Sequence, residues 1–173
     1  HSQAAPVTQH QAPGGDVLGR SKRGGGKLYD LEFLEDENGR RVAAFGWHAG
    51  FAGAALGLLS LAEQLQGRRL GPQAAYPNED EFLKRTRAAV EVIRKHRQDK
   101  RVTALVIGAL GRCGRGAIDC LVKSGVQLDD VARWDLQETS AKSGPYQEIV
   151  ESEVCFNCIY LSKKNPPLGE AAL

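Results

Sequence analysis

Methionine is absent from the 173 residues, and the chain begins with His1. Because a translation product starts with methionine, we expect a processed or truncated chain. An excess of either charge is also lacking, since 23 basic and 21 acidic residues give a formal net charge of +2. A balance this close to neutral indicates no particular class of partner. The length and the 42% hydrophobic content suffice for one domain with a buried core.

Long apolar runs are missing as well. No run approaches the roughly 20 residues that a helix needs to cross a bilayer. The first residues also lack the apolar segment of a signal peptide. The sequence therefore predicts a soluble protein without a membrane partner, and we expect it in the cytoplasm.

Cysteine is scarce, with only four residues, which excludes a small disulfide-rich scaffold. Cys155 and Cys158 have the CxxC spacing of a redox pair or of half a zinc site. Their setting, VCFNCIYLS, is instead typical of a buried strand, in which residues three apart point to opposite faces. The pattern therefore favours buried thiols, and we expect no metal.

Basic residues cluster in a glycine-rich head, residues 1–26, which has almost no apolar periodicity. This composition is typical of a flexible, solvated tail. The cluster comes without aromatic residues on which bases could stack, so we expect no nucleic-acid partner.

Residues 27–35 (KLYDLEFLE) and 41–45 (RVAAF) are predicted to form two strands of a β-hairpin, joined by the turn DENG. Residues 46–66 follow as an apolar helix, buried on nearly all sides. Its glycines recur every three or four residues and line one face that another backbone can approach, at positions 46, 50, 53 and 57. We interpret that face as a helix-packing surface.

The second half of the chain has the pattern of a parallel α/β sheet. Asn78 caps an amphipathic helix that ends near residue 97. A continuous apolar strand is predicted at 102–107, a short helix at 117–123, and further strands at 131–136 and 154–161. This order of elements predicts right-handed crossovers between parallel strands.

Glycines at the first strand-to-helix turn indicate a dinucleotide site. Gly108, Gly111 and Gly114 would let a pyrophosphate approach the backbone N–H groups at the helix start. Asp135 follows the next strand, where a carboxylate accepts the ribose hydroxyls of NAD and repels the extra phosphate of NADP. A turn without a ligand is the alternative, and the combination favours the nucleotide.

Several longer segments resemble the fungal saccharopine dehydrogenase family, which forms lysine with NAD. They are GKLYDLEFLEDENGRRVAAFG, AGFAGAALG, YPNE, VIGALGRCGRGAID, WDLQET and NCIYLSK, in this order along the chain. The family's enzyme is about twice as long, and this chain resembles its middle. The resemblance implies a partial Rossmann-like domain at 46–173, preceded by a hairpin at 27–45 that belongs to the substrate-side domain.

The resemblance implies an oxidoreductase that converts saccharopine to lysine and 2-oxoglutarate and passes hydride to NAD. It places the NAD contacts on Arg40, Gly111, Arg112, Asp135, Thr139 and Tyr160, and the turn pattern adds Gly108 and Gly114 to the same site. It places the substrate contacts on Gln11, Arg41 and Phe45, and an active-site glutamate that tunes neighbouring charges on Glu32. It also implies a regulatory disulfide between Cys113 and Cys158, which we expect to be close together and reduced in a cytosol.

The chain departs from the family at the acid/base pair, a lysine and a histidine. The lysine would lie upstream of residue 1, and Pro6, which cannot transfer a proton, stands where the histidine is expected. We therefore expect no turnover by this polypeptide alone. The alternative is a non-catalytic nucleotide-binding or protein-interaction module derived from the same fold.

The family resemblance also implies that further strands of the sheet lie beyond this sequence. We therefore expect self-association through an apolar sheet edge at 154–161, or through the glycine face of residues 46–57.

Overall fold

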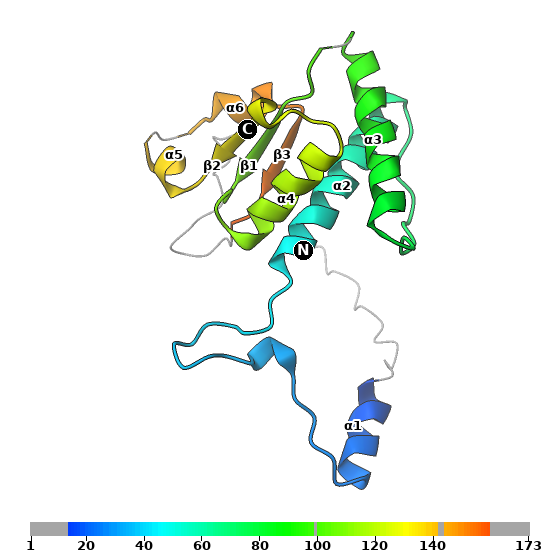
Figure 1. Cartoon of the computed structure of the whole chain (residues 1–173), viewed down its shortest axis with the longest axis vertical. Helices are drawn as coiled ribbons and strands as arrows, with labels where there is room; N and C mark the ends of the chain where they lie inside the picture. Colours follow the sequence, from blue (N-terminus) through cyan, green and yellow to red (C-terminus); the bar gives the residue numbers. More distant parts are fainter. Residues whose placement is uncertain (1–13, 99, 142–143, 160–173) are drawn as a thin grey trace, which may run out of the picture. The chain divides into compact units, whose positions relative to one another are not determined.

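The computed structural model describes residues 14–98, 100–141 and 144–159 (Figure 1). The chain divides between Ala44 and Phe45 into two compact units, residues 1–44 and 45–173, and each is described by itself. Within the described residues, no helix combines the length and the apolar character that a membrane span requires.

The first unit contains a helix where the sequence predicted a flexible head. Helix α1 spans Gly14–Arg23, and a short 3₁₀ helix, η1, spans Leu31–Phe33. The predicted turn is present, because Gly39 N–H donates to the Asp36 carbonyl at 3.0 Å. The two predicted strands are wrong: one bridge between Glu35 and Arg41 replaces them.

The missing strands have a physical cause. A two-stranded hairpin is marginal unless one of its faces is buried against something else. In this unit the large apolar side chains of the predicted strands are exposed, namely those of Leu28, Tyr29, Leu31, Phe33, Leu34 and Val42. The alternating pattern therefore has no partner surface within the unit, and antiparallel pairing is limited to residues 34–42 around the turn, where Val42 N–H donates to the Leu34 carbonyl at 2.8 Å.

The second unit is built on a parallel sheet, as predicted. Strands β1 (Ala104–Ile107), β2 (Val131–Trp134) and β3 (Val154–Asn157) lie in the order β2-β1-β3. The central strand β1 pairs in parallel with both neighbours and is buried along its whole length, which explains its continuous apolar run. The short helices η2 (Leu128–Asp130), α5 (Leu136–Ser140) and α6 (Gln147–Glu151) lie in the connections.

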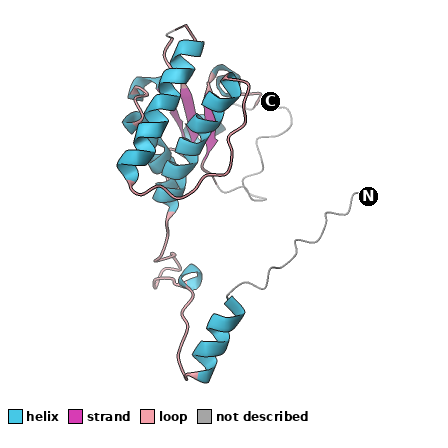
Figure 2. Ribbon diagram, turned by 90° about the vertical axis from the view of Figure 1, so that its right-hand side faces the viewer, coloured by secondary structure: helices cyan, strands magenta, loops and turns pink. Residues whose placement is uncertain are grey.

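Helices cover the sheet, as Figure 2 shows. Ala104 and Val106 of β1 belong to a core with α2 (Gly46–Leu65), α3 (Glu79–His96) and α4 (Arg112–Lys123). Leu105 and Ile107 point the other way, into a smaller cluster with Trp134 and Tyr146. The predicted Asn78 cap of α3 is confirmed, since its Oδ1 accepts from Glu81 N–H at 2.9 Å. Helix α4 begins at Arg112, earlier than the predicted residue 117.

Two glycines bring α2 and α4 into backbone contact. A Cβ on Gly50 would lie 1.8 Å from the carbonyl oxygen of Cys113, and one on Gly116 would lie 1.9 Å from that of Trp47. Gly57 likewise faces the ring of Phe156 on β3. The glycine face of α2 is thus a packing surface within the unit, so the predicted association of two chains through it is wrong. Gly53 points into open space.

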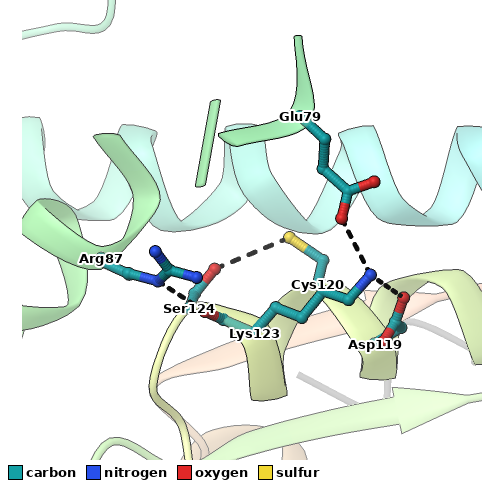
Figure 3. A network of polar contacts seen from close by, with 6 residues as sticks. All are labelled: Glu79, Arg87, Asp119, Cys120, Lys123 and Ser124. Atoms are coloured by element: carbon teal, nitrogen blue, oxygen red, sulfur yellow. Dashed lines mark hydrogen bonds and ion pairs between the residues drawn. The ribbon is translucent and has the colours of Figure 1, made fainter. Parts of the chain in front are cut away.

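A polar network fastens α3 to the last turn of α4 (Figure 3). Lys123 Nζ lies 2.8 Å from Glu79 Oε1 and 3.0 Å from Asp119 Oδ2. Arg87 Nε donates to the Lys123 carbonyl at 2.9 Å. Beneath these contacts, the buried Ser124 hydroxyl donates to Thr86 Oγ1 at 2.7 Å. These contacts hold α4 at its carboxyl end, and the glycine contacts with α2 hold it near its start.

Candidate nucleotide-binding site

The turn between β1 and α4 is held by backbone hydrogen bonds. The N–H groups of Gly108 and Ala109 donate to the Trp134 carbonyl at 2.8 and 2.9 Å, and Gly111 N–H donates to the Gly108 carbonyl at 3.1 Å. Gly108 has φ +82°, a left-handed conformation that favours glycine. A Cβ there would also lie 2.8 Å from the Ile159 side chain. The turn is therefore fixed against the ends of both outer strands.

The other two glycines open the start of α4. Gly111 is the N-cap residue and has no side chain to cover the helix end. A Cβ on Gly114 would lie 2.2 Å from the Gly108 carbonyl oxygen, so only glycine lets α4 approach the turn this closely. Arg115 N–H donates to the Gly111 carbonyl at 3.0 Å. The preceding helix amides have no carbonyl partner within the helix and can bind an anion.

The carboxylate of Asp135 lies against this turn. Its Oδ2 accepts from Leu110 N–H at 3.0 Å, and its Oδ1 accepts from Leu136 N–H at 2.9 Å. Its own N–H donates to Glu138 Oε2 at 2.7 Å, which completes a capping box at the start of α5. Asp135, the acid that the sequence predicted to bind ribose, is thus fixed beside the glycine turn, although it lies on a different loop.

A cavity of about 650 Å³ opens beside Asp135. Its apolar walls come from the turn, α4 and the β2 connections, namely from Ala109, Leu110, Ile118, Leu128 and Leu136. Its polar lining consists of Arg115, Arg133, Asp135, Gln137 and Glu138. An apolar cleft with a few polar groups at its edge suits a nucleobase and its ribose.

Comparison with known proteins also points to a dinucleotide-binding chain. The chain is 49% identical to the saccharopine dehydrogenase [NAD(+), L-lysine-forming] of Candida albicans over 179 residues. It is 50% identical to that of Yarrowia lipolytica over 174 residues and 46% identical to that of Schizosaccharomyces pombe over 168 residues. This chain is homologous to part of these saccharopine dehydrogenases.

The matches to these saccharopine dehydrogenases cover 96% of the chain but only 47%, 46% and 45% of the three relatives. The chain therefore spans just under half of their length. No family model matches it. The α/β fold with a parallel sheet agrees with the partial Rossmann-like domain that the resemblance implied.

Similarity to saccharopine dehydrogenases assigns four further positions to NAD, and the structure describes three of them. Arg112 is exposed at the first position of α4. The Thr139 hydroxyl donates to the Asp135 carbonyl at 2.9 Å, so it supports the loop that carries the acid. Arg40, in the first unit, is exposed, and its N–H donates to Asp36 Oδ1 at 2.9 Å. Tyr160 lies outside the described residues.

The structure brings a predicted substrate contact, Arg41, together with the predicted active-site glutamate, Glu32. Arg41 Nη2 lies 2.5 Å from Glu32 Oε2, and both side chains are exposed in the first unit. Phe45, the first residue of the second unit, is 67% exposed. Gln11 lies outside the described residues.

Cys113 and Cys158, the pair implied by saccharopine dehydrogenase similarity, are neighbours. A hydrogen bond joins their side chains, and burial followed by this bond raises the pKa of the Cys158 thiol. The prediction of two buried thiols in the CxxC is wrong for Cys155, which is exposed on the alternating strand β3. The fully buried thiol is Cys120, and burial raises its pKa to about 11. All four cysteines are free thiols.

Sequence reasoning missed Arg115 and Arg133, which line the cavity. Charged residues on a helix or an outer strand are ordinarily solvated, so composition gave no signal for them. Their positions did carry one. Arg115 follows the N-cap Gly111 by one helical turn, and Arg133 precedes Asp135 by two residues.

Proposed function

We propose that the chain forms the adenosine and pyrophosphate side of the NAD site in a saccharopine dehydrogenase. That enzyme would oxidise saccharopine with NAD to give lysine and 2-oxoglutarate. The observation that carries the proposal is the hydrogen bond between Asp135 Oδ2 and Leu110 N–H, which fixes a carboxylate at the glycine turn. The names of the relatives support the reaction, and the fit of the turn and cavity supports the cofactor.

Each part of the site would have a separate task in holding the cofactor. The first amides of α4 bind the pyrophosphate, and Gly111 and Gly114 leave the backbone accessible to it. Asp135 keeps free lone pairs on both carboxylate oxygens and accepts the ribose hydroxyls. The apolar cavity walls pack against the adenine. Arg112, exposed at the helix start, supplies positive charge to the pyrophosphate.

The reaction itself would need more than this polypeptide. Bound NAD supplies the hydride acceptor in the complete enzyme. From the first unit, Arg41 would bind a substrate carboxylate, and Glu32, paired with it, would balance its charge. The segment 27–45 then belongs to the substrate side and 46–173 to the nucleotide domain, in a cytoplasmic enzyme. Pro6 replaces the proton-transferring histidine, so we do not assign turnover to the 173-residue chain.

Calorimetric titration of NAD into the chain tests the proposal. We expect binding that Asp135→Ala weakens by at least about tenfold, since hydrogen bonds from the ribose to a charged group are lost. Asn78→Ala is the matched control, because it also removes an N-cap, worth about 1 kcal/mol, but at the remote helix α3. Equal losses in both variants, or no heat with NAD, would contradict the proposed site.

We also propose that the chain self-associates through strand β3. Strands β2 and β3 are the two edges of the described sheet, and β3 carries exposed residues that include Cys155. Sedimentation velocity at tens of micromolar should show dimers. Cys155→Lys, a charge on the open edge, should give monomers, whereas Cys155→Ser should not. A clean monomer of the unaltered chain would remove the proposal.

A further inference from the structure

Two arginines in the cavity have no partner of their own among the residues that the structure describes. Arg115 comes from α4 and Arg133 from β2, and both are exposed and line the space beside Asp135. Other arginines of the second unit are engaged, for example Arg94 with Glu91, Arg97 with Glu153, and Arg101 with Asp130. The two guanidinium groups therefore remain available to a ligand.

The acids of the same cavity accept hydrogen bonds from the backbone. Both carboxylate oxygens of Asp135 accept backbone N–H groups, from Leu110 and Leu136. Glu138 Oε2 accepts the N–H of Asp135. These N–H donors stabilise the ionised acids, and neither acid forms an ion pair with Arg115 or Arg133 among the described residues. The two arginines therefore bring two positive charges to the cavity that also holds the carboxylates of Asp135 and Glu138.

We propose that Arg115 and Arg133 bind a phosphate on the adenosine ribose, so that the site accepts 2′-phosphorylated nucleotides of the NADP type as well as NAD. This inference rests on the proposed nucleotide site. Guanidinium groups match phosphate oxygens in paired hydrogen bonds, and an arginine near the ribose is the usual means of accommodating a 2′-phosphate. Asp135 still repels that phosphate, which makes NADP the weaker ligand, and the arginines reduce the difference.

The test compares two small probes on the full chain, adenosine 5′-monophosphate and adenosine 2′,5′-bisphosphate. The unaltered chain should bind both. Arg115→Ala and Arg133→Ala should each weaken binding of the bisphosphate by about tenfold, the loss expected for a charge-assisted hydrogen bond. The affinity for the monophosphate should change less than about twofold. Asp135→Asn, which keeps an N-cap side chain, should shift the preference toward the bisphosphate. Arg69→Ala is the control, since Arg69 is exposed and lies outside this cavity.

The outcomes separate the two proposals. If the monophosphate and NAD bind but the bisphosphate is rejected, or is unaffected by both arginine variants, the phosphate role is overturned and the nucleotide site stands. If neither probe nor NAD binds, both the proposed nucleotide site and the phosphate-binding role of the arginines are refuted. Equal weakening of both probes in the arginine variants also overturns the proposal, because it would show a general effect of charge or folding.

Discussion

Gly50→Ala should lower the free energy of unfolding of the second unit by about 3 kcal/mol, the upper end of the range for overpacking. The added methyl group would lie 1.8 Å from the carbonyl oxygen of Cys113 and 2.7 Å from its carbonyl carbon. Both are backbone atoms, so no rotamer change relieves the clash, and α2 must move away from α4. Urea unfolding followed by circular dichroism measures the loss.

Gly53→Ala is the matched control on the same helix. Its Cβ would meet nothing within 4 Å, and the position is exposed. The substitution should therefore raise stability by about 0.5–1 kcal/mol, the difference in helix propensity between alanine and glycine. If Gly50→Ala behaved like Gly53→Ala, the close crossing of α2 and α4 would be refuted.

Gly114→Ala should abolish nucleotide binding and also destabilise the unit by about 2 kcal/mol, again through overpacking. Its Cβ would lie 2.2 Å from the Gly108 carbonyl oxygen and 2.7 Å from Ala109 Cα. The start of α4 must then separate from the turn, which displaces the amides that we assign to the pyrophosphate. NAD titration and urea unfolding of the same preparation give both quantities.

Gly111→Ala distinguishes the two effects of Gly114→Ala. Gly111 has φ −72° and ψ 167°, which any residue adopts, and its Cβ would make a single close contact, 3.3 Å from the Gly108 carbonyl oxygen. Stability should change little, while NAD binding falls because a side chain now stands at the open helix end. Unchanged binding in Gly111→Ala would mean that the pyrophosphate does not lie against the N-cap.

Local patterns in the sequence predicted the second unit well. The apolar run of β1 and the Asn78 cap each carry their own signal, because burial on both faces and N–H capping select particular residue types. The start of α4 carried none: Gly114 and Gly116 are poor helix formers, so the pattern predicted a later start. Packing against α2 decides the conformation there, and that contact joins distant parts of the sequence.

In the first unit, local patterns in the sequence predicted the structure poorly. Alternating residues in 27–45 predicted two strands, yet strands need a surface to cover, and the apolar side chains of this unit are exposed. In the site, the glycine turn and Asp135 were predictable because they follow strand ends in a known order. The cavity that Arg115, Arg133 and Asp135 share was not, since only the three-dimensional structure brings these three residues together.

The crossing of α2 and α4 limits how the sequence can change. The atom that a side chain at position 50 would meet is a carbonyl oxygen, and so is the atom opposite Gly116. Every amino acid carries that oxygen, so no replacement at position 113 or 47 can make room. A second-site suppressor of Gly50→Ala at its contact partner is therefore excluded. Positions 50 and 116 must each remain glycine, whatever side chains stand at 113 and 47.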